Sequence, residues 1–584
     1  MHANIICEKR ILIVTREVVP FHYGGIGTQF KSLAAFLIRR GHHVAFLSQR
    51  PEYFNETLYR DHYGDTSLHF VDVPPGQTGP PQPLVYAAEV ARRFDEIYPV
   101  VRPDLVILAE FNAEGLFLLM RADAGAYGET QFLITINGMN REIISAHEGD
   151  RPTTSPSLMD LPEIQSLLAM EDLCVQLAPR IVSPSLCVWE EIGRRLGIAR
   201  PARIIPNLID PVLFRPDEEE KRDLAEEPLI LFVGRLDRIK GADLLLRAFF
   251  EIVRECPDAI PRLVFIGRDC WWNEYGSTFL EYWRDKIPER YAGSISFLGQ
   301  VSHDAIRDHL SKATVAVFPS RWEAFGIVCL EALSMGCPVV VSRGTGLEEV
   351  LGPELSEFAV PVTGDIDPLA RKILSLLKPG RDESRVLGDG SQGSDLSKRL
   401  RNRAWEVVQQ AEAGWTNLLE GLDRKDRAKP PIDGPICDAL ERLLGSLEEQ
   451  WRGHCYMQIY FRRHGHYSER DSLRRPYSRF RWTALKLLLP SGTGESPLRL
   501  DPSDRPGVIR IREIALSDEK DGQLWRADGT NAFKGCRVAG EATATFGNGC
   551  LIIRAKTEDP QILIDCPVTD RPLEMHVTLL YGED

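Results

Sequence analysis

Short apolar runs separated by longer amphipathic and polar stretches dominate the first 425 residues. Within residues 1–205 the runs are ILIV at 11–14, VAFL at 44–47, LVIL at 105–108 and FLITI at 132–136. A second series, within residues 206–425, begins at Leu229 and reads LILFVG, RLVFIG, SISFLG, TVAVFPS and PVVVS. Buried strands that alternate with helical patterns predict a parallel sheet covered by helices on both faces. The pattern therefore predicts two Rossmann-like, doubly wound α/β domains.

The pattern changes after a helical stretch at 395–422. Residues 426–495 are expected to form a linker, with a short amphipathic helix at 436–451 and a basic amphipathic segment at 452–486. That segment mixes nine Lys or Arg with aromatic residues, which suits contact with an anionic membrane surface or an acidic glycan; a solvated linker face is the alternative. Residues 496–584 alternate apolar and polar positions without helical runs, which predicts an all-β, sandwich-like accessory domain.

Charge and cysteine content narrow the class of protein. The 584 residues include 70 Lys and Arg against 84 Asp and Glu, a formal net charge of −14, which argues against nucleic acid as a partner. The 12 cysteines form no CxxC pair and no cluster with zinc-ligand spacing, as in proteins of a reduced cytoplasm. No apolar run is long enough to cross a bilayer. We expect a cytoplasmic protein, either free or held peripherally at the inner face of the membrane through 452–486.

Two loops that follow predicted strands have the composition of phosphate sites. Gly24 and Gly25, in FHYGGIGTQF, let backbone amides approach a ligand just before a helix, although a tight turn is an equal interpretation. The loop is not a dinucleotide fingerprint, because Phe30 stands where GxGxxG needs its third glycine. Arg235 and Lys240, in FVGRLDRIKG, would neutralise a diphosphate; solvated surface cations are the alternative.

A third loop, PSRWEAFGIVCLEALSMG, carries the strongest signal. Gly326 permits close approach of a ligand, and the amides of the following helix are free to bind phosphate. Glu331 lies one to two turns into that helix, where a carboxylate can accept two ribose hydroxyls, and Glu323 would face a sugar. Acidic residues that only stabilise the start of a helix are the alternative.

Five motifs occur in the order of a known family and extend from Ile11 to Leu422: GGIG, PNLID, GRLDRIKG, FLGQVS and EAFGIVCLE. On these motifs the chain resembles the glycogen-synthase-like, family-four group of GT-B retaining glycosyltransferases. The resemblance implies two domains that face a cleft in which a sugar leaves a nucleotide-sugar donor. It also implies that the helix at 395–422 crosses back to the first domain.

The resemblance further implies a role for each motif residue. Gly24 and Gly25 would cover the donor diphosphate, which Arg235 and Lys240 would bind from the opposite side. The other implied contacts are Glu323 with sugar hydroxyls, Glu331 with the ribose, the backbone of Phe325, Gly326 and Ile327 with phosphate, and Gln300 and Val301 with the base.

One position departs from the family. Asn137 ends the strand FLITI where many relatives have a histidine that hydrogen-bonds the donor sugar. Asparagine donates and accepts hydrogen bonds but does not titrate, so it offers the sugar a contact without a proton shuttle.

The resemblance implies transfer with retention of configuration and without a metal, in which the acceptor attacks the face that the diphosphate leaves. The DxD-like string at Asp365 and Asp367 is interpreted as a loop and N-cap before a helix. No cofactor is expected beyond a UDP-, GDP-, ADP- or dTDP-sugar donor. The acceptor would be a glycan, a lipid-linked acceptor or a small molecule, with bacterial polysaccharide or glycoconjugate synthesis as the expected setting.

Two other functions stay open at this point. A sugar-nucleotide epimerase would share the nucleotide cleft, and a noncatalytic glycan-binding or assembly protein would explain Asn137. The C-terminal β domain weakly resembles accessory domains of bacterial surface-polysaccharide transferases. By fold analogy alone, it would bind carbohydrate or mediate assembly. Nucleobase, sugar, acceptor and oligomeric state do not follow from the sequence.

Overall fold

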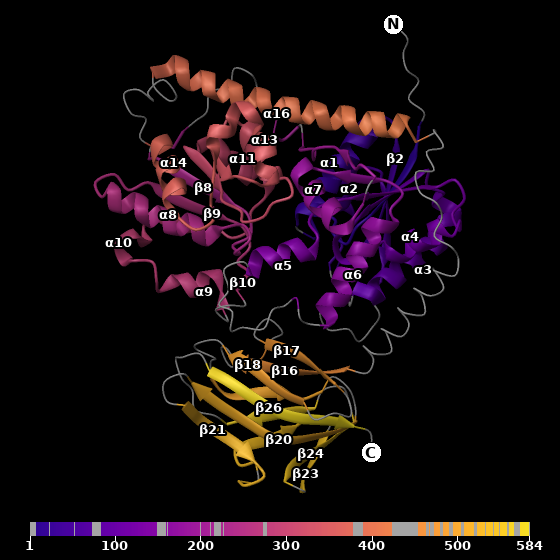
Figure 1. Cartoon of the computed structure of the whole chain (residues 1–584), viewed down its shortest axis with the longest axis vertical. Helices are drawn as coiled ribbons and strands as arrows, with labels where there is room; N and C mark the ends of the chain where they lie inside the picture. Colours follow the sequence, from indigo (N-terminus) through magenta and orange to yellow (C-terminus); the bar gives the residue numbers. More distant parts are fainter. Residues whose placement is uncertain are drawn as a thin grey trace. The chain divides into compact units, whose positions relative to one another are not determined.

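A computed structural model of the chain describes residues 8–422 and 454–582, apart from breaks of which the longest are 73–82, 149–158, 215–223 and 378–388. The chain divides into two compact units (Figure 1). The larger unit comprises residues 1–270 and 287–437, and the smaller comprises 271–286 and 438–584. The helix predicted at 436–451 lies outside the described residues. No helix within the described ranges is long and apolar enough to cross a lipid bilayer.

The first half of the larger unit is a parallel sheet in the order β3-β2-β1-β4-β5-β6-β7. Its strands are β1 (Arg10–Val14), β2 (His43–Gln49), β3 (Ser67–Val71), β4 (Leu105–Ala109), β5 (Gln131–Thr135), β6 (Ile181–Ser183) and β7 (Arg203–Ile204). Its helices include α1 (Gly25–Arg39), α2 (Glu56–Tyr63), α3 (Pro83–Val101), α4 (Leu116–Asp123), α5 (Asn140–Glu148), α6 (Pro162–Leu177) and α7 (Leu186–Leu196). Every residue of β4 is buried, because helices cover both faces of the sheet.

The second half repeats this plan in a sheet of order β12-β9-β8-β13-β14-β15. Its strands are β8 (Leu229–Val233), β9 (Arg262–Ile266), β12 (Ile295–Phe297), β13 (Val315–Phe318), β14 (Val339–Ser342) and β15 (Ala359–Val360). Its helices include α8 (Ala242–Glu255), α10 (Glu289–Ala292), α11 (His303–Lys312), α12 (Ile327–Ser334), α13 (Gly346–Leu351) and α14 (Asp367–Leu377). The two Rossmann-like domains predicted from the apolar runs are therefore confirmed.

The long helix α16 (Asp389–Glu420) runs past both halves of the larger unit (Figure 1). In the second half, the Ser397 hydroxyl donates to the Gly336 carbonyl at 2.9 Å. In the first half, Arg39 forms an ion pair with Glu412 at 3.5 Å. The helix thus has the return path that the family resemblance implies.

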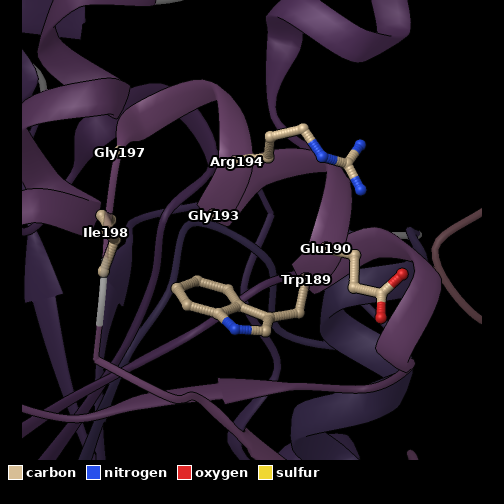
Figure 2. A pocket seen from close by; sticks show the side chains of 6 residues that line it. All are labelled: Trp189, Glu190, Gly193, Arg194, Gly197 and Ile198. Carbon is tan, nitrogen blue, oxygen red and sulfur yellow. The ribbon is translucent and has the colours of Figure 1, made fainter.

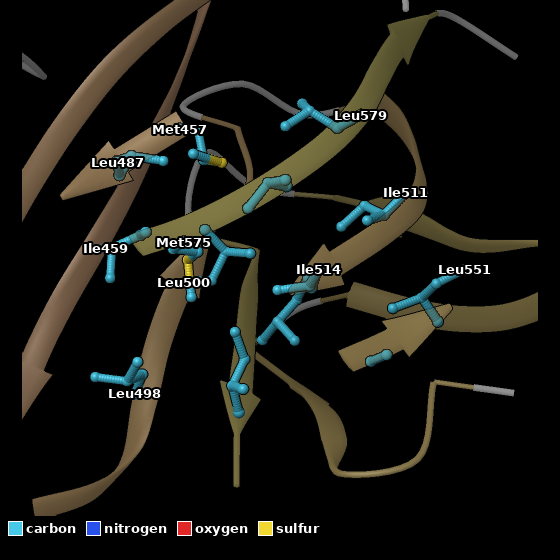
Figure 3. Packing of buried hydrophobic residues seen from close by; sticks show 14 of the residues in the cluster. Met457, Ile459, Leu487, Leu498, Leu500, Ile511, Ile514, Leu551, Met575 and Leu579 are labelled. Atoms are coloured by element: carbon cyan, nitrogen blue, oxygen red, sulfur yellow. The ribbon is translucent and has the colours of Figure 1, made fainter. Parts of the chain in front are cut away.

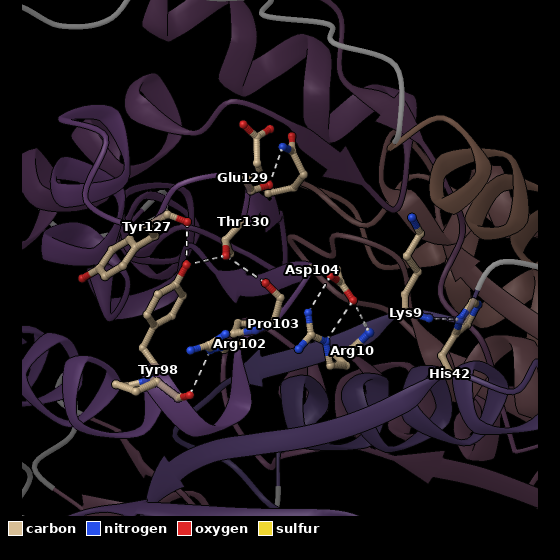
Figure 4. Close-up of polar contacts among 12 residues, drawn as sticks. Lys9, Arg10, His42, Tyr98, Arg102, Pro103, Asp104, Tyr127, Glu129 and Thr130 are labelled. Carbon is tan, nitrogen blue, oxygen red and sulfur yellow. Dashed lines mark hydrogen bonds and ion pairs between the residues drawn. The ribbon is translucent and has the colours of Figure 1, made fainter.

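Polar contacts hold the amino ends of the central strands of the first sheet (Figure 4). The first residue of β1, Arg10, donates its backbone amide to Asp104 Oδ2 at 2.7 Å, and its guanidinium contacts Asp104 Oδ1 at 3.1 Å. The Tyr98 hydroxyl donates to the Tyr127 carbonyl at 2.6 Å. These contacts lie at the opposite end of the strands from the loops with candidate chemistry, so we assign them to the fold.

The smaller unit is an antiparallel sandwich. One sheet has the order β17-β16-β19-β25-β22, and the other has the order β18-β26-β20-β24-β23 with β21 paired to β20. The strands are β16 (His454–Arg462), β17 (Ser472–Ser478), β18 (Thr483–Leu489), β19 (Glu495–Asp501), β20 (Gly507–Asp518), β21 (Gly522–Asp528), β22 (Cys536–Ala539), β23 (Ala542–Gly547), β24 (Cys550–Ala555), β25 (Gln561–Ile564) and β26 (Leu573–Gly582). Residues 271–286 of the same unit form β10 (Trp271–Trp272), β11 (Ser277–Thr278) and α9 (Phe279–Arg284). The predicted C-terminal all-β domain is confirmed.

The sandwich begins earlier than the sequence predicts. Met457 and Ile459 of β16 are almost fully buried in the core (Figure 3). Phe461 continues their alternation along the strand and is buried to the same extent. The expectation of a linker over 426–495 is therefore wrong from His454 onward. Basic and aromatic residues around the apolar residues made it difficult to recognise that every second side chain of this strand faces the core. Many side chains of 452–486 lie outside the described residues, so the membrane contact of this segment stays a prediction.

Candidate active site

The predicted site residues follow the carboxyl ends of strands in both sheets of the larger unit. Gly24 and Gly25 follow β1, and Asn137 follows β5. In the second half, Arg235 and Lys240 follow β8. The remaining predicted residues lie after β12, at Gln300 and Val301, and after β13, at Glu323, Phe325, Gly326, Ile327 and Glu331. Ligands of open parallel sheets bind at these ends, near the point where the strand order reverses.

Lys240 and Glu323 form a direct ion pair. Lys240 Nζ donates to Glu323 Oε2 at 2.5 Å, although the two residues are 83 positions apart. Asp237 was missed by the sequence analysis and organises the basic residues: its carboxylate accepts from Arg235 Nε at 2.8 Å and from the Lys240 amide at 2.8 Å. The signal was present, because Asp237 stands between the two cations in GRLDRIKG. Its buried carboxylate fixes the loop and leaves the Lys240 ammonium directed at Glu323.

The start of α12 requires a glycine. Gly326 has φ +91°, and a Cβ atom there would lie 2.2 Å from Leu347 Cδ2. Phe325 is buried beside it, and the Glu323 carbonyl accepts from the Gly346 amide at 2.9 Å. The loop is therefore held in one shape by packing and by its backbone, with the first turn of α12 directly behind it.

Glu331 is a buried acid of α12. Only 2% of the residue is exposed, and Oε2 has no hydrogen-bond partner among the described residues. Burial, with the charge of Asp210 as a smaller contribution, raises the pKa of Glu331 to about 8. A buried polar atom without a partner is uncommon in folded proteins and suits a position that a ligand completes.

Asn137 is oriented by a glutamate that the sequence analysis missed. The buried carboxylate of Glu110 accepts from the Asn137 amide at 2.7 Å, from Asn137 Nδ2 at 3.1 Å and from the Gly138 amide at 2.6 Å. Asn137 Nδ2 also donates to the Thr135 carbonyl at 2.9 Å, and Asn137 Oδ1 has no partner within the described ranges. With its donor group used, Asn137 has an acceptor oxygen to offer. The sequence signal for Glu110 was an acidic residue directly after the strand β4, two positions beyond the run LVIL.

The glycine loop already holds a carboxyl group of the protein itself. The Gly27 amide, in the first turn of α1, donates to Glu17 Oε2 at 2.9 Å, and a Cβ on Gly24 would lie 2.1 Å from that atom. Burial raises the pKa of Glu17, against the opposing effects of the Gly27 amide and of the Arg235 and Arg268 charges. Position 24 therefore needs a glycine because a side chain there would collide with Glu17. Position 25 has open space where a Cβ would be.

The two halves of the larger unit contact each other beside these loops. The Ser185 hydroxyl, just before α7, donates to the Ala324 carbonyl at 2.7 Å. His147, at the end of α5, is close enough to Asp237 and Arg235 for their charges to affect its pKa, which burial lowers. The loops after β8 and β13 are thus adjacent to the first half.

The structure adds little to the predicted roles of Gln300 and Val301. Gln300 and Val301 lie between β12 and α11, where Ser302 caps α11 by accepting from the Ala305 amide at 3.3 Å. Gln300 is exposed, which leaves it available to a ligand. The Asp367 amide, at the first residue of α14, donates to Asp365 Oδ1 at 2.9 Å, so Asp365 belongs to the loop that leads into the helix.

A surface pocket of about 340 Å³ lies elsewhere (Figure 2). It surrounds the C-terminal end of α7 and is lined by Trp189, Glu190, Gly193, Arg194, Gly197 and Ile198. None of the predicted site residues lines it, so we do not assign it to the candidate active site.

Comparison with known proteins agrees with this fold. Residues 23–213 match Glycosyltransferase Family 4, and residues 214–390 match Glycosyl transferases group 1. Together the matches cover more than half of the chain and both halves of the larger unit. The chain therefore belongs to the family-four glycosyltransferases of GT-B fold.

Individual relatives are distant. D-inositol 3-phosphate glycosyltransferase 2 of Catenulispora acidiphila is 30% identical over 36% of this chain and 53% of its own length, so the match spans about half of that relative. A phosphatidylinositol N-acetylglucosaminyltransferase subunit of Arabidopsis thaliana is 26% identical over 63% of this chain and 75% of its own. Sucrose-phosphate synthase from Thermosynechococcus elongatus has a similar fold, with a TM-score of 0.55 and 20% identity over 71% of this chain and 99% of its own.

Proposed function

We propose that the protein is a retaining glycosyltransferase that moves a sugar from a nucleoside-diphosphate sugar to an acceptor, without a metal. The observation that carries the proposal is the 2.5 Å ion pair between Lys240 and Glu323. Lys240 is the implied diphosphate ligand and Glu323 the implied sugar ligand, so their contact allows one donor molecule to meet both. The membership of both α/β halves in one glycosyltransferase family supports the same function.

The proposed chemistry places positive charge where the leaving group becomes negative. As the bond from the sugar to the diphosphate breaks, Arg235, Lys240 and the first amides of α12 would stabilise the departing oxygen. Glu323 would hold hydroxyls of the sugar ring, and Asn137 Oδ1 would accept from another hydroxyl. Glu331 would accept from the ribose, which completes its unpartnered oxygen.

The acceptor is proposed at the level of class. The setting first expected was bacterial polysaccharide or glycoconjugate synthesis with a glycan or lipid-linked acceptor. The names of two relatives add acceptors that contain an inositol phosphate. We therefore propose a hydroxyl of a glycan, a lipid-linked acceptor or an inositol phosphate as the attacking group.

Binding of nucleoside diphosphates is the first test. UDP, GDP, ADP and dTDP are titrated against the full chain, and one of them is expected to raise the melting temperature, because a ligand of the native state stabilises it. Lys240→Ala is expected to weaken that ligand by about tenfold or more, since it removes a charge-assisted contact. Arg371→Ala, which removes an exposed cation of α14, is the control. The proposal fails if none of the four binds or if both variants behave alike.

Product analysis separates the proposed reaction from the alternatives. With the sugar conjugate of the bound nucleotide, transfer or slow hydrolysis is expected, and NMR of the first product should show the anomeric configuration of the donor. Glu323→Ala should abolish turnover. A changed sugar with no transfer would identify an epimerase. Binding without turnover, unaltered in Asn137→His, would identify a noncatalytic protein.

A further inference from the structure

Trp322 is held in place by its two neighbours in the sequence. Arg321 forms an ion pair with the buried Asp243, with both guanidinium contacts at 2.8 Å, and Glu323 pairs with Lys240. Both anchors belong to the second half of the larger unit. The backbone of Trp322 is therefore fixed to that half by a charged contact on either side.

The side chain of Trp322 extends to the first half. Its indole Nε1 donates to Glu191 Oε2 on α7 at 3.3 Å. Its six-membered ring lies against Gly138, where a Cβ would be 3.0 Å from Cζ3 and 3.2 Å from Cη2. Gly138 has φ +141°, and its amide is bound by Glu110. The indole thus occupies the space that the side chain of any other residue at position 138 would need.

This contact gathers the residues proposed to hold the sugar. Asn137 directly precedes Gly138, and Glu323 directly follows Trp322, so the contact between indole and glycine brings the backbones of Asn137 and Glu323 close to each other. The Trp322 indole is half-buried and its only N–H is already bonded, which leaves an apolar ring surface. Aromatic walls combined with a few oriented polar groups are the usual composition of small-molecule pockets.

We propose that Trp322 determines sugar specificity: its indole is the wall against which the donor's sugar ring packs, and Gly138 sets the room that remains. The inference rests on the proposed function, because it assigns a wall to the same donor site. It predicts that Trp322 contributes to binding of the sugar and not of the nucleotide.

Isothermal titration of the full chain tests this. The probes are whichever of UDP, GDP, ADP and dTDP binds the wild type, and its glucose and N-acetylglucosamine conjugates. Trp322→Ala and Trp322→Leu should raise the Kd of at least one conjugate by about tenfold, while the Kd of the diphosphate changes by less than about twofold. Trp322→Phe, which keeps a ring, should lie in between. Two substitutions of different size guard against misfolding of one, and melting curves identify folded variants.

Glu191→Gln is the matched control, because it leaves the indole in place and keeps an oxygen that accepts from Nε1. Both Kd values should stay near those of the wild type. Equal weakening of diphosphate and conjugate in Trp322→Leu would show a structural role and overturn the inference, as would no change in either. If no diphosphate binds the wild type, the proposed function fails first and the inference fails with it.

Discussion

Glu349 of α13 caps the amino end of α7 in the other half of the larger unit, accepting from the Cys187 amide at 2.6 Å and from the Leu186 amide at 2.8 Å. A carboxylate at this end of a helix satisfies free amides and complements the helix dipole. Because α13 belongs to the second half and α7 to the first, this cap connects the two halves next to Ser185 and the loop that carries Glu323.

Removal of this cap should loosen the larger unit. Glu349→Ala is expected to destabilise the protein by about 1 kcal/mol, the usual effect of losing an N-terminal cap. Thermal and denaturant unfolding of the full chain measure it. Glu348→Ala is the control, since the Glu348 carboxylate accepts from the Gly344 amide of its own half, at 2.7 Å. Equal destabilisation by both variants would contradict a role in holding the halves together.

Glu17 should compete with a diphosphate. Its carboxylate lies at the glycine loop, facing the charges of Arg235 and Arg268. Glu17→Gln removes one negative charge from this place and is expected to tighten diphosphate binding by about tenfold. Because the pKa of Glu17 is raised, lowering the pH should protonate it and bring the wild type closer to the variant. The ratio of the two Kd values, measured over a series of decreasing pH, cancels the titration of the nucleotide. A ratio of one at every pH would refute the competition.

Glu331 should make stability depend on pH. Its pKa is about 8 in the folded protein, above its value in an unfolded chain. The contribution of Glu331 to the free energy of unfolding is fully present below the pKa of the unfolded chain, and it is lost as the pH rises through 8. Glu331→Gln never buries a charge, so its stability relative to the wild type should increase with pH, by at most about 1.4 kcal/mol per pH unit. Denaturant unfolding from pH 6 to 9 measures this, and the exposed Glu354→Gln should show no such trend.

Gly138→Ala should be more harmful than an ordinary glycine substitution. An alanine at this position is strained by the positive φ and also collides with Trp322. The free energy of unfolding is therefore expected to fall by about 2 kcal/mol or more. Gly125→Ala has a positive φ of +84° with open space around it, and so isolates the backbone contribution. In a Trp322→Ala background the excess should disappear. If Gly138→Ala costs no more than Gly125→Ala in the wild type, the indole is not packed against Gly138.

The sequence motifs predicted more of the fold and of the candidate site than the composition did. The apolar runs ending at Val14, Val233 and Phe318 predicted strands correctly, because a strand buried on both faces is apolar at every position. The loops after them carried Arg235, Lys240 and Glu323, since ligands bind at the carboxyl ends of such strands. The segment from His454 was misread, because the basic and aromatic residues around Met457, Ile459 and Phe461 obscure the alternation of these inward-facing apolar residues.

The tertiary structure alone decided which partners these residues have. Nothing near Asn137 in the sequence indicates that Glu110 orients it, and nothing near Gly24 indicates that Glu17 occupies its loop. The indole of Trp322 meets Gly138 only when two separate sheets come together. Local sequence sets which backbone shape each segment prefers, whereas burial, charge pairing and steric room arise between segments that are distant along the chain, so they exist only once the chain has folded.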